Sequence, residues 1–187
     1  MLSLDLGDGA ELRALEPWQA EEFLAHIDSV REYLRPHITL PDRVKDLHEA
    51  RKLLQRFAQM QASDTGRIYG IWVNGSLCGG VMFRKFDPVG GTCELGVWLA
   101  PETQGRGLMT SAVKLMIDWA IGVRGIGRVE WLATTDNERS IAVAKRVGMS
   151  LEGIKRSDYV LNGERRDSAV YSMTVDDWAQ SQIRGGV

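Results

Sequence analysis

The sequence is poor in cysteine and contains neither a long apolar run nor a recognisable leader. Its two cysteines, Cys78 and Cys93, are not spaced as a disulfide framework or a metal site, so we expect two reduced thiols in the core. No apolar stretch is long enough to cross a bilayer, and the amino terminus lacks the basic and apolar regions of a signal peptide. These absences predict a cytoplasmic protein that does not contact a membrane.

An excess of charge of one sign is also missing. The formal net charge of the 187 residues is −2 at pH 7, so the chain lacks the basic footprint of a nucleic-acid-binding protein and direct DNA binding is not expected. The histidines His26, His37 and His48 do not follow a metal-ligand spacing, and no metal is expected. Hydrophobic residues (44%) and charged residues (26%) occur at the levels of an ordinary globular protein. We therefore expect residues 1–187 to form a single domain.

The first third of the chain is predicted to be mainly helical. A short strand is expected over residues 10–15, followed by a helix over 17–33 that begins at a proline and ends before Pro36. Asp42 is expected to cap a second helix that runs through residues 47–58. The apolar residues at helical spacing in the first helix are Phe23, Ile27, Val30 and Leu34.

Beyond residue 66, short strands and tight turns predominate. Asn74-Gly75 and Asn162-Gly163 are both two-residue hairpin signals. The apolar run of RVEWLATT suggests a strand that is buried on both faces. This order of elements predicts an α+β protein with a mixed sheet. The expected elements are strands over 67–73, 76–86 and 92–100, a helix over 108–121, a strand over 128–135, a helix over 137–148 and two strands around 162–163.

A glycine-rich turn at residues 104–107 (QGRG) is the strongest local signal. It follows an expected strand and opens an expected helix, so the unpaired amides and the dipole of the helix start would favour a pyrophosphate. Arg106 would add a charge-assisted contact. Many turns of this kind only reverse the chain, and the turn alone leaves that alternative open. Its spacing is not that of a dinucleotide-binding turn or a P-loop, which disfavours NAD and ATP.

Several ordered segments carry a family resemblance from about Ile68 to the end: ELGVWL (94–99), QGRGLMT, DNERSIAVAKRVGM, LEGIKR, DYVLNG and YSM. With them the chain resembles the GNAT superfamily of N-acetyltransferases, and within it the Rim-type ribosomal-protein N-terminal acetyltransferases. QGRGLM matches the family's Q/R-x-x-G-x-G/A signature as far as Gly107, whereas Met109 stands where glycine or alanine is usual. The resemblance implies the GNAT fold, a mixed, mostly antiparallel, twisted sheet of about seven strands with helices on both faces.

The resemblance further implies acetyl-CoA as a cosubstrate. In such enzymes the pyrophosphate binds amides of the glycine-rich loop, and the pantetheine arm pairs like an extra strand with the strand that ends at Leu99, where Gly96 would mark a bulge. Asn137 would contact the same arm, although its alternative role is only to cap a helix. The implied cofactor residues are Val97, Trp98, Leu99, Gln104, Gly105, Arg106, Gly107, Leu108, Met109, Thr110, Asn137 and Ser140.

Two residues match catalytic positions of the family. Glu94 corresponds to the glutamate beside the acetyl group and is the candidate base, with a solvent-facing strand residue as its alternative. Ser140 corresponds to the serine near the thioester sulfur and would stabilise the leaving thiolate, although a first-turn serine that satisfies the helix end is the alternative. Many GNAT enzymes use a tyrosine near the position of Ala144, and its absence here favours Ser140 as the partner of the thiolate.

The acceptor of the acetyl group is less well defined. His37 and Tyr159 are candidate substrate contacts, and a surface histidine is the alternative for His37. The resemblance implies direct transfer to a primary amine, either a protein N-terminal α-amine or a small amine such as an antibiotic or a polyamine. A non-catalytic acyl-CoA-binding sensor is an alternative of another class, and a homodimer is possible by analogy with relatives.

Overall fold

A computed structural model describes residues 3–185 and divides the chain into two compact units. The first unit contains the residues up to Met82 together with Val97–Ala112, and the second contains Phe83–Gly96 and the residues from Val113 onward. Hydrogen bonds order the eight strands of the described residues as β1-β2-β3-β4-β5-β6-β8-β7. The predicted α+β class is therefore confirmed, with eight strands where about seven were expected. The single domain stays a prediction: the chain divides into two units, but the strands β4 and β5 contribute residues to both of them.

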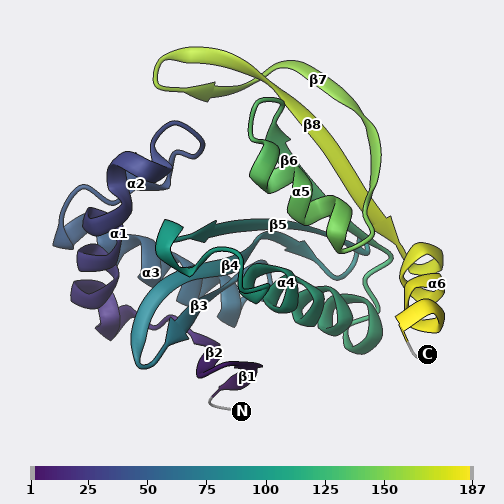
Figure 1. Cartoon of the computed structure of the whole chain (residues 1–187), viewed down its shortest axis with the longest axis horizontal. Helices are drawn as coiled ribbons and strands as arrows, with labels where there is room; N and C mark the ends of the chain where they lie inside the picture. The colour runs from purple at the N-terminus through teal and green to yellow at the C-terminus, as the bar shows by residue number, and fades with distance from the viewer. Residues whose placement is uncertain (1–2, 186–187) are drawn as a thin grey trace. The chain divides into compact units, whose positions relative to one another are not determined.

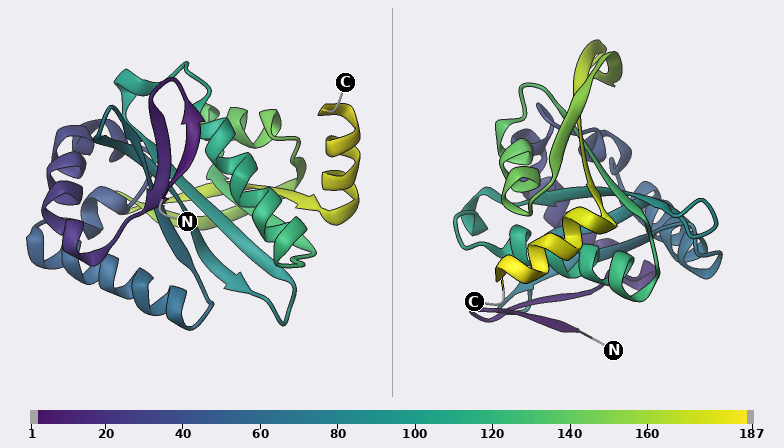
Figure 2. Two further views of the ribbon diagram at one scale, coloured as in Figure 1. Left: turned by 90° about the horizontal axis from the view of Figure 1, so that it is seen from below. Right: turned by 90° about the vertical axis from the view of Figure 1, so that its right-hand side faces the viewer.

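Short strands begin the first unit. β2 (Ala10–Ala14) is confirmed, but the hairpin that it forms with β1 (Leu4–Gly7) was not predicted, because four residues are too few for a periodic signal (Figure 2). β2 pairs on its other side with β3 (Arg67–Val73) in antiparallel register. Asn74 and Gly75 both have positive φ angles, 50° and 81°, as the predicted tight turn into β4 (Ser76–Asp87) requires.

Two long helices pack against the strands of this unit and contribute much of its apolar core. The 3-10 turn η1 (Pro17–Gln19) leads into α1 (Ala20–Leu34), and α1 packs beside α3 (Leu47–Ala62) (Figure 1). The four apolar residues predicted for α1 are all buried, which confirms the expected face. The expected cap of α3 was wrong: Asp42 lies inside α2 (Leu40–Arg43), and Asp46 accepts a hydrogen bond from the Glu49 amide at 2.9 Å.

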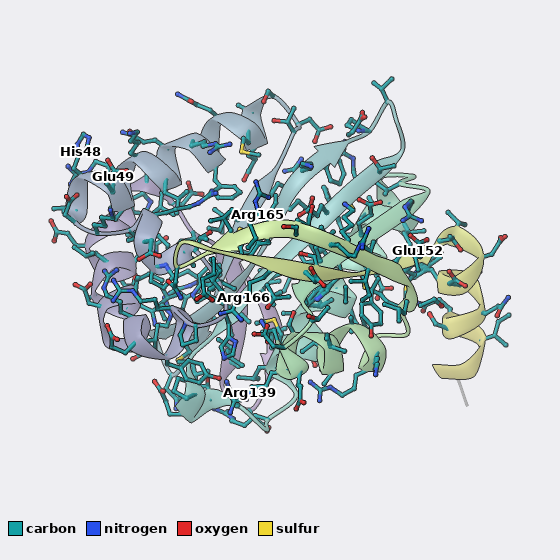
Figure 3. The ribbon with its side chains drawn as sticks, turned by 90° about the horizontal axis from the view of Figure 1, so that it is seen from above. His48, Glu49, Arg139, Glu152, Arg165 and Arg166 are labelled. Carbon is teal, nitrogen blue, oxygen red and sulfur yellow. The ribbon has the colours of Figure 1, made fainter. Side chains whose placement is uncertain are left out.

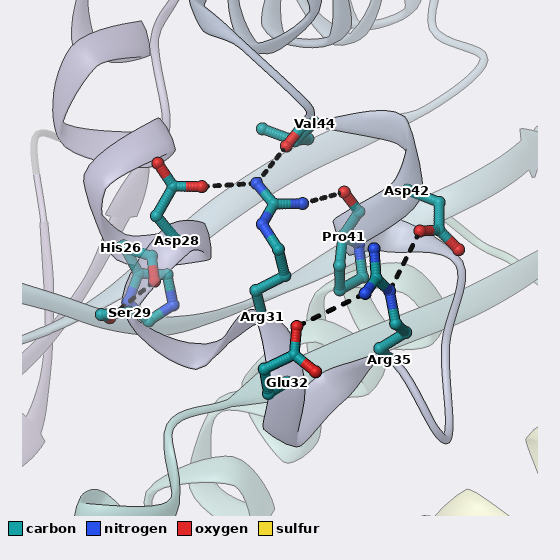
Figure 4. Close-up of polar contacts among 9 residues, drawn as sticks. All are labelled: His26, Asp28, Ser29, Arg31, Glu32, Arg35, Pro41, Asp42 and Val44. Carbon is teal, nitrogen blue, oxygen red and sulfur yellow. Dashed lines mark hydrogen bonds and ion pairs between the residues drawn. The ribbon is translucent and has the colours of Figure 1, made fainter.

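Arg31 explains why the proline-containing segment after α1 folds back as α2. Its guanidinium donates to the carbonyl oxygens of Pro41 and, at 2.7 Å, of Val44, so it satisfies two backbone acceptors of this connection (Figure 4). The side chain of Asp42 instead contacts Arg35 at 3.4 Å, which occupies the carboxylate that was expected to cap α3.

The second unit contains part of β5 together with the strands β6, β7 and β8. β5 (Thr92–Leu99) pairs in parallel with β6 (Arg128–Thr134) over the register Thr92–Arg128 to Leu95–Trp131. β6 pairs in antiparallel register with β8 (Glu164–Thr174), which pairs with β7 (Ser150–Leu161) along the hairpin seen in Figure 1.

The prediction that β6 is buried on both faces was wrong. Buried and half-buried residues alternate along this strand, as in a sheet with one apolar face. Arg128 occupies the other face, where it pairs with Glu130 at 2.9 Å and with Glu152 at 2.5 Å. The apolar run therefore overstated the burial of the strand.

The remaining helices follow the predicted order with one addition. The 3-10 turn η2 (Pro101–Thr103) precedes α4 (Leu108–Asp118), which continues as a π-helical turn η3 (Trp119–Val123), and α5 is Glu138–Arg146. α6 (Val175–Gly185) was not predicted and continues directly from β8 (Figure 2). Within residues 3–185, no helix combines the length and apolar character needed to cross a membrane.

Candidate functional site

The glycine-rich loop lies in the first unit, between η2 and α4. Gly105 and Gly107 have φ angles of 77° and 76°, in the left-handed region that favours glycine. An added Cβ at either position would meet nothing within 4 Å, so the backbone conformation, not lack of space, requires glycine. The first hydrogen bond of α4 runs from Ser111 N to Gly107 O at 3.0 Å. The amides of the residues just before Ser111 therefore precede the internal ladder of the helix, as an anion site needs.

Both polar side chains of this loop have partners within the first unit. Gln104 donates from its amide nitrogen to the Tyr33 hydroxyl, and the Arg106 guanidinium donates to the Asp8 carbonyl at 2.9 Å. Neither Tyr33 nor Asp8 was singled out from the sequence, because each is at least 71 residues away along the chain. A contact between Arg106 and a ligand would require this side chain to leave Asp8.

Leu108, Met109 and Thr110 begin α4. The side chains of Leu108 and Met109 are buried, whereas Thr110 is half-buried. An anion at this helix start would therefore meet the main chain of Leu108 and Met109, not their side chains. This arrangement explains how Met109 can stand where the family usually has glycine or alanine.

The end of β5 also belongs to the first unit. Val97 and Leu99 are half-buried, whereas the Trp98 side chain is 2% exposed. The Trp98 indole donates to His26 Nε2 at 3.1 Å and meets the Phe23 ring edge-on at a centroid distance of 6.0 Å. Trp98 is thus a core residue, and only its backbone remains for the predicted contact with a pantetheine arm.

Glu94 lies on the part of β5 that belongs to the second unit. It is only 8% exposed, which excludes the solvent-facing alternative. Its carboxylate forms ion pairs with Arg84 and, at 3.5 Å, with Lys85. An added Cβ on Gly96 would lie 3.0 Å from Arg84 Cδ, so this glycine leaves room for the Arg84 side chain whose guanidinium pairs with Glu94. Glu94 could accept a proton only by giving up these two ion pairs.

Asn137 and Ser140 lie together at the start of α5 in the second unit. Asn137 caps the helix, since its side-chain oxygen accepts from the Ser140 amide at 3.1 Å. Ser140 is half-buried, and its hydroxyl oxygen accepts from the Trp131 indole nitrogen at 3.0 Å. The capping role of Asn137 is therefore confirmed, and its contact with a cofactor stays a prediction. The sequence did not single out Trp131, which reaches Ser140 from β6.

Thr134 is a second residue that sequence reasoning missed. It ends β6, three residues before Asn137, and is 4% exposed. Among the described residues, its buried hydroxyl oxygen has no hydrogen-bond partner. A buried hydroxyl of this kind is normally satisfied, so Thr134 offers a free donor and acceptor next to the α5 start.

The two candidate acceptor contacts lie in different units. His37 follows α1 in the first unit and is half-buried, and its Nδ1 atom is buried without a partner among residues 3–183. Tyr159 lies on β7 of the second unit and pairs in register with Arg166 of β8. Figure 3 labels Arg165 and Arg166 on this hairpin, where Arg165 donates to the Ser157 carbonyl at 2.7 Å and supports an irregular stretch of β7.

The two thiols are unsuited to covalent catalysis. Both are free and buried, as predicted. Burial raises the pKa of Cys93 to about 12, with a smaller contribution from Glu130, and burial also raises the pKa of Cys78. Both therefore stay protonated at neutral pH, whereas a nucleophilic cysteine must be a thiolate.

The comparisons with known proteins all find similarity to acetyltransferases. A family model described as "Acetyltransferase (GNAT) domain" matches residues 10–150. The ribosomal-protein-serine acetyltransferase of Escherichia coli (strain K12) is 24% identical over 174 residues, which cover 93% of this chain and 97% of that protein. The spermidine N(1)-acetyltransferase of the same organism is 28% identical over 102 residues, 54% of this chain and 55% of that protein.

A solved structure supports the same assignment. The chain resembles RimL, a ribosomal L7/L12 alpha-N-protein acetyltransferase in complex with coenzyme A. The TM-score is 0.86 at 25% identity, and the match covers 94% of this chain and 99% of the other. The neighbour contains coenzyme A, the molecule whose pyrophosphate was predicted to bind the glycine-rich loop.

Proposed function

The chain belongs to the GNAT acetyltransferase family, and from this premise we propose that it transfers the acetyl group of acetyl-CoA directly to the α-amine of a protein N-terminus. The observation that carries the proposal is the start of α4, where two left-handed glycines precede backbone amides outside the helical ladder. These amides suit the pyrophosphate of coenzyme A. Under the proposal they bind it within residues Gln104–Thr110, and the backbone of Val97–Leu99 binds the pantetheine arm.

The energetics of the acceptor favour an α-amine. An amine must lose its proton before it can attack a thioester. At pH 7 this costs about 4–5 kcal/mol for a lysine with a pKa of ~10.4, but only about 1 kcal/mol for an α-amine with a pKa of ~7.8. A site with one carboxylate base is therefore better matched to an N-terminal amine.

We assign the chemical roles as follows. Glu94, directly or through a water molecule, accepts the proton of the attacking amine. A backbone amide near Val97 polarises the thioester carbonyl. The Ser140 hydroxyl donates to the sulfur that leaves. The Ser140 oxygen accepts from the Trp131 indole, so its own proton remains available to the sulfur, which supports the role of Ser140. Glu94 would exchange its ion pairs with Arg84 and Lys85 for the proton of the amine.

A small amine is the second candidate acceptor. The match to a spermidine N(1)-acetyltransferase favours it, although that match covers only about half of each chain. A polyamine has a high pKa and would require more help with deprotonation than an α-amine. Its binding would also call for acidic groups near the acceptor.

An acetylation assay would decide between the two acceptors. The protein is incubated with acetyl-CoA and either a peptide that begins with serine or alanine and contains one lysine, or spermidine. Mass spectrometry then locates the acetyl group. Acetylation of the free-amino peptide, with none of the same peptide after formylation of its N-terminus, is the expected result. Acetylation of spermidine alone would establish the second candidate, and release of coenzyme A with neither would contradict both.

Two finer features belong to the proposal. We expect a cytoplasmic protein and a homodimer, on the analogy with relatives. Analytical ultracentrifugation at micromolar concentration measures the second of these directly, and a sedimenting monomer would contradict it.

A further inference from the structure

Trp131 donates a hydrogen bond to the hydroxyl oxygen of Ser140 at the start of α5. Trp131 lies on β6, is 1% exposed and pairs in register with Leu95 of β5 and Tyr171 of β8. Its indole nitrogen lies 3.0 Å from Ser140 Oγ. A tryptophan side chain buried in the middle of a sheet cannot change its position easily, so the donor is fixed.

The chemistry of the indole decides which atom carries the proton. An indole N–H only donates, so the Ser140 oxygen is the acceptor in this bond. The hydroxyl proton of Ser140 must therefore point elsewhere. If the serine turned away, a buried N–H would lose its partner, which is unfavourable. Since the Ser140 amide is held by Asn137 at 3.1 Å, both ends of the serine are constrained.

We propose that Trp131 is a positioning residue for acetyl transfer and acts through Ser140. The proposal rests on the proposed function. The indole N–H occupies one lone pair of Ser140 Oγ, directs its proton toward the leaving sulfur and strengthens the hydroxyl as a donor through hydrogen-bond cooperativity. When the C–S bond breaks, its electron pair passes to the sulfur and Ser140 donates a hydrogen bond to the thiolate. The proton of the amine leaves separately, through Glu94 or water.

A matched pair of tryptophans separates this role from packing. In the other unit, Trp72 is also fully buried and donates from its indole nitrogen to Glu22 at 2.8 Å. Its hydrogen-bond partner Glu22 and the Arg13 guanidinium over its ring have no proposed catalytic role. Trp131→Phe and Trp72→Phe therefore both remove a buried indole N–H and part of a ring, but only the first changes the hydrogen bond to Ser140.

The test measures kcat and KM for acetyl-CoA in wild type, Trp131→Phe, Ser140→Ala, the double variant and Trp72→Phe. We expect Trp131→Phe to lower kcat about 5- to 20-fold with KM within about twofold, as for an interaction that acts after substrate binding. In the Ser140→Ala background the same change should have no further effect on kcat, because the indole would have no hydroxyl to hold. Trp72→Phe should keep the kcat of the wild type.

Three results would overturn the inference. They are a kcat of Trp131→Phe equal to that of the wild type, additive effects of the two substitutions, and an equal loss of kcat in Trp72→Phe. If Trp131→Phe fails to fold, 3-benzothienylalanine at position 131 keeps the shape of the ring without the N–H and should give the same loss of kcat. A wild-type protein that binds coenzyme A but acetylates no amine would contradict the proposed function itself. An active wild type whose kcat is unchanged by Trp131→Phe would contradict only the role of Trp131, so the two failures can be distinguished.

Discussion

At the scale of single residues, His26 shows how burial sets a protonation state. The ring is 7% exposed and accepts the hydrogen bond of the Trp98 indole. Burial lowers the pKa of His26 from 6.5 to about 4, although Glu102 and Glu22 act in the opposite direction. The ring is therefore neutral at pH 7, which is the state that can accept from an indole N–H.

Acidification should consequently destabilise the protein through His26. Between pH 6.5 and 4 the unfolded chain binds a proton at His26 that the folded chain does not, so the free energy of unfolding falls as the pH is lowered through this window. The full loss is about 3 kcal/mol, and little further loss from this residue is expected below pH 4.

Urea unfolding at pH 7, 5.5 and 4 checks this prediction. His26→Gln keeps a hydrogen-bond acceptor without a titrating ring, and its stability should depend less on pH than that of the wild type. Because carboxylates also titrate at low pH, the quantity to compare is the difference between the two proteins. Parallel pH profiles would contradict the role of His26.

Ser140 and its neighbours show what sequence reasoning could reach at this scale. The Asn137 cap, given as the alternative role of that residue, and the glycine-rich turn at residues 104–107 depend on local chain geometry, so residue type and spacing could indicate them. The left-handed angles of Gly105 and Gly107 came only from the structure. The bond from Trp131 to Ser140 depends on how β6 and α5 pack, and no local pattern encodes that contact. The ion pairs of Glu94 were not predicted because they join this residue of β5 to Arg84 and Lys85 of β4, and no local pattern encodes a contact between two strands.

At the scale of elements, long and periodic segments were predictable and short ones were not. α1, α3 and α5 carry apolar residues at helical spacing, and both Asn-Gly turns specify hairpins. α2 is a single turn that owes its conformation partly to Arg31, which lies ten residues before its carbonyl partner in Pro41. α6 had a signal that was overlooked: the Thr174 and Asp177 side chains each bond the other's backbone amide, at 3.0 and 3.3 Å.

The start of α3 provides a test at this scale. Asp46→Ala should lower the free energy of unfolding by about 1 kcal/mol, because the Glu49 amide would lose its capping acceptor. Asp42→Ala removes only a contact of 3.4 Å to a partly exposed Arg35 and should cost much less. Urea unfolding of both variants measures the difference. If Asp42→Ala were the more destabilising of the two, the assignment of the cap would be wrong.

At the scale of the whole molecule, ligand binding should appear as a change in thermal stability. A ligand that binds only the folded protein stabilises it by about 2.7 kcal/mol at one hundred times its Kd. For a chain of this size that corresponds to a rise in Tm of roughly 5–10 °C. We expect this rise with coenzyme A, and a much smaller one with pantetheine at the same concentration, because pantetheine has no pyrophosphate for the loop.

Scanning calorimetry with the Gly107→Ala variant completes this prediction. A side chain at a φ of 76° strains the loop, so the rise in Tm with coenzyme A should shrink. Gly125→Ala is the matched control, since Gly125 also has a positive φ of 68° and open space around a built Cβ. An equal rise for both variants, or an equal effect of pantetheine and coenzyme A on the wild type, would remove the loop from the site.

The buried cysteines have a practical consequence for every rate measured on this protein. Product formation can be followed with a chromogenic disulfide that reports each sulfhydryl set free. Cys78 and Cys93 are shielded, and the raised pKa of both keeps them in the unreactive form. The colour that develops should therefore come from turnover alone, and the baseline without substrate should stay flat. The two cysteines need not be replaced for this assay.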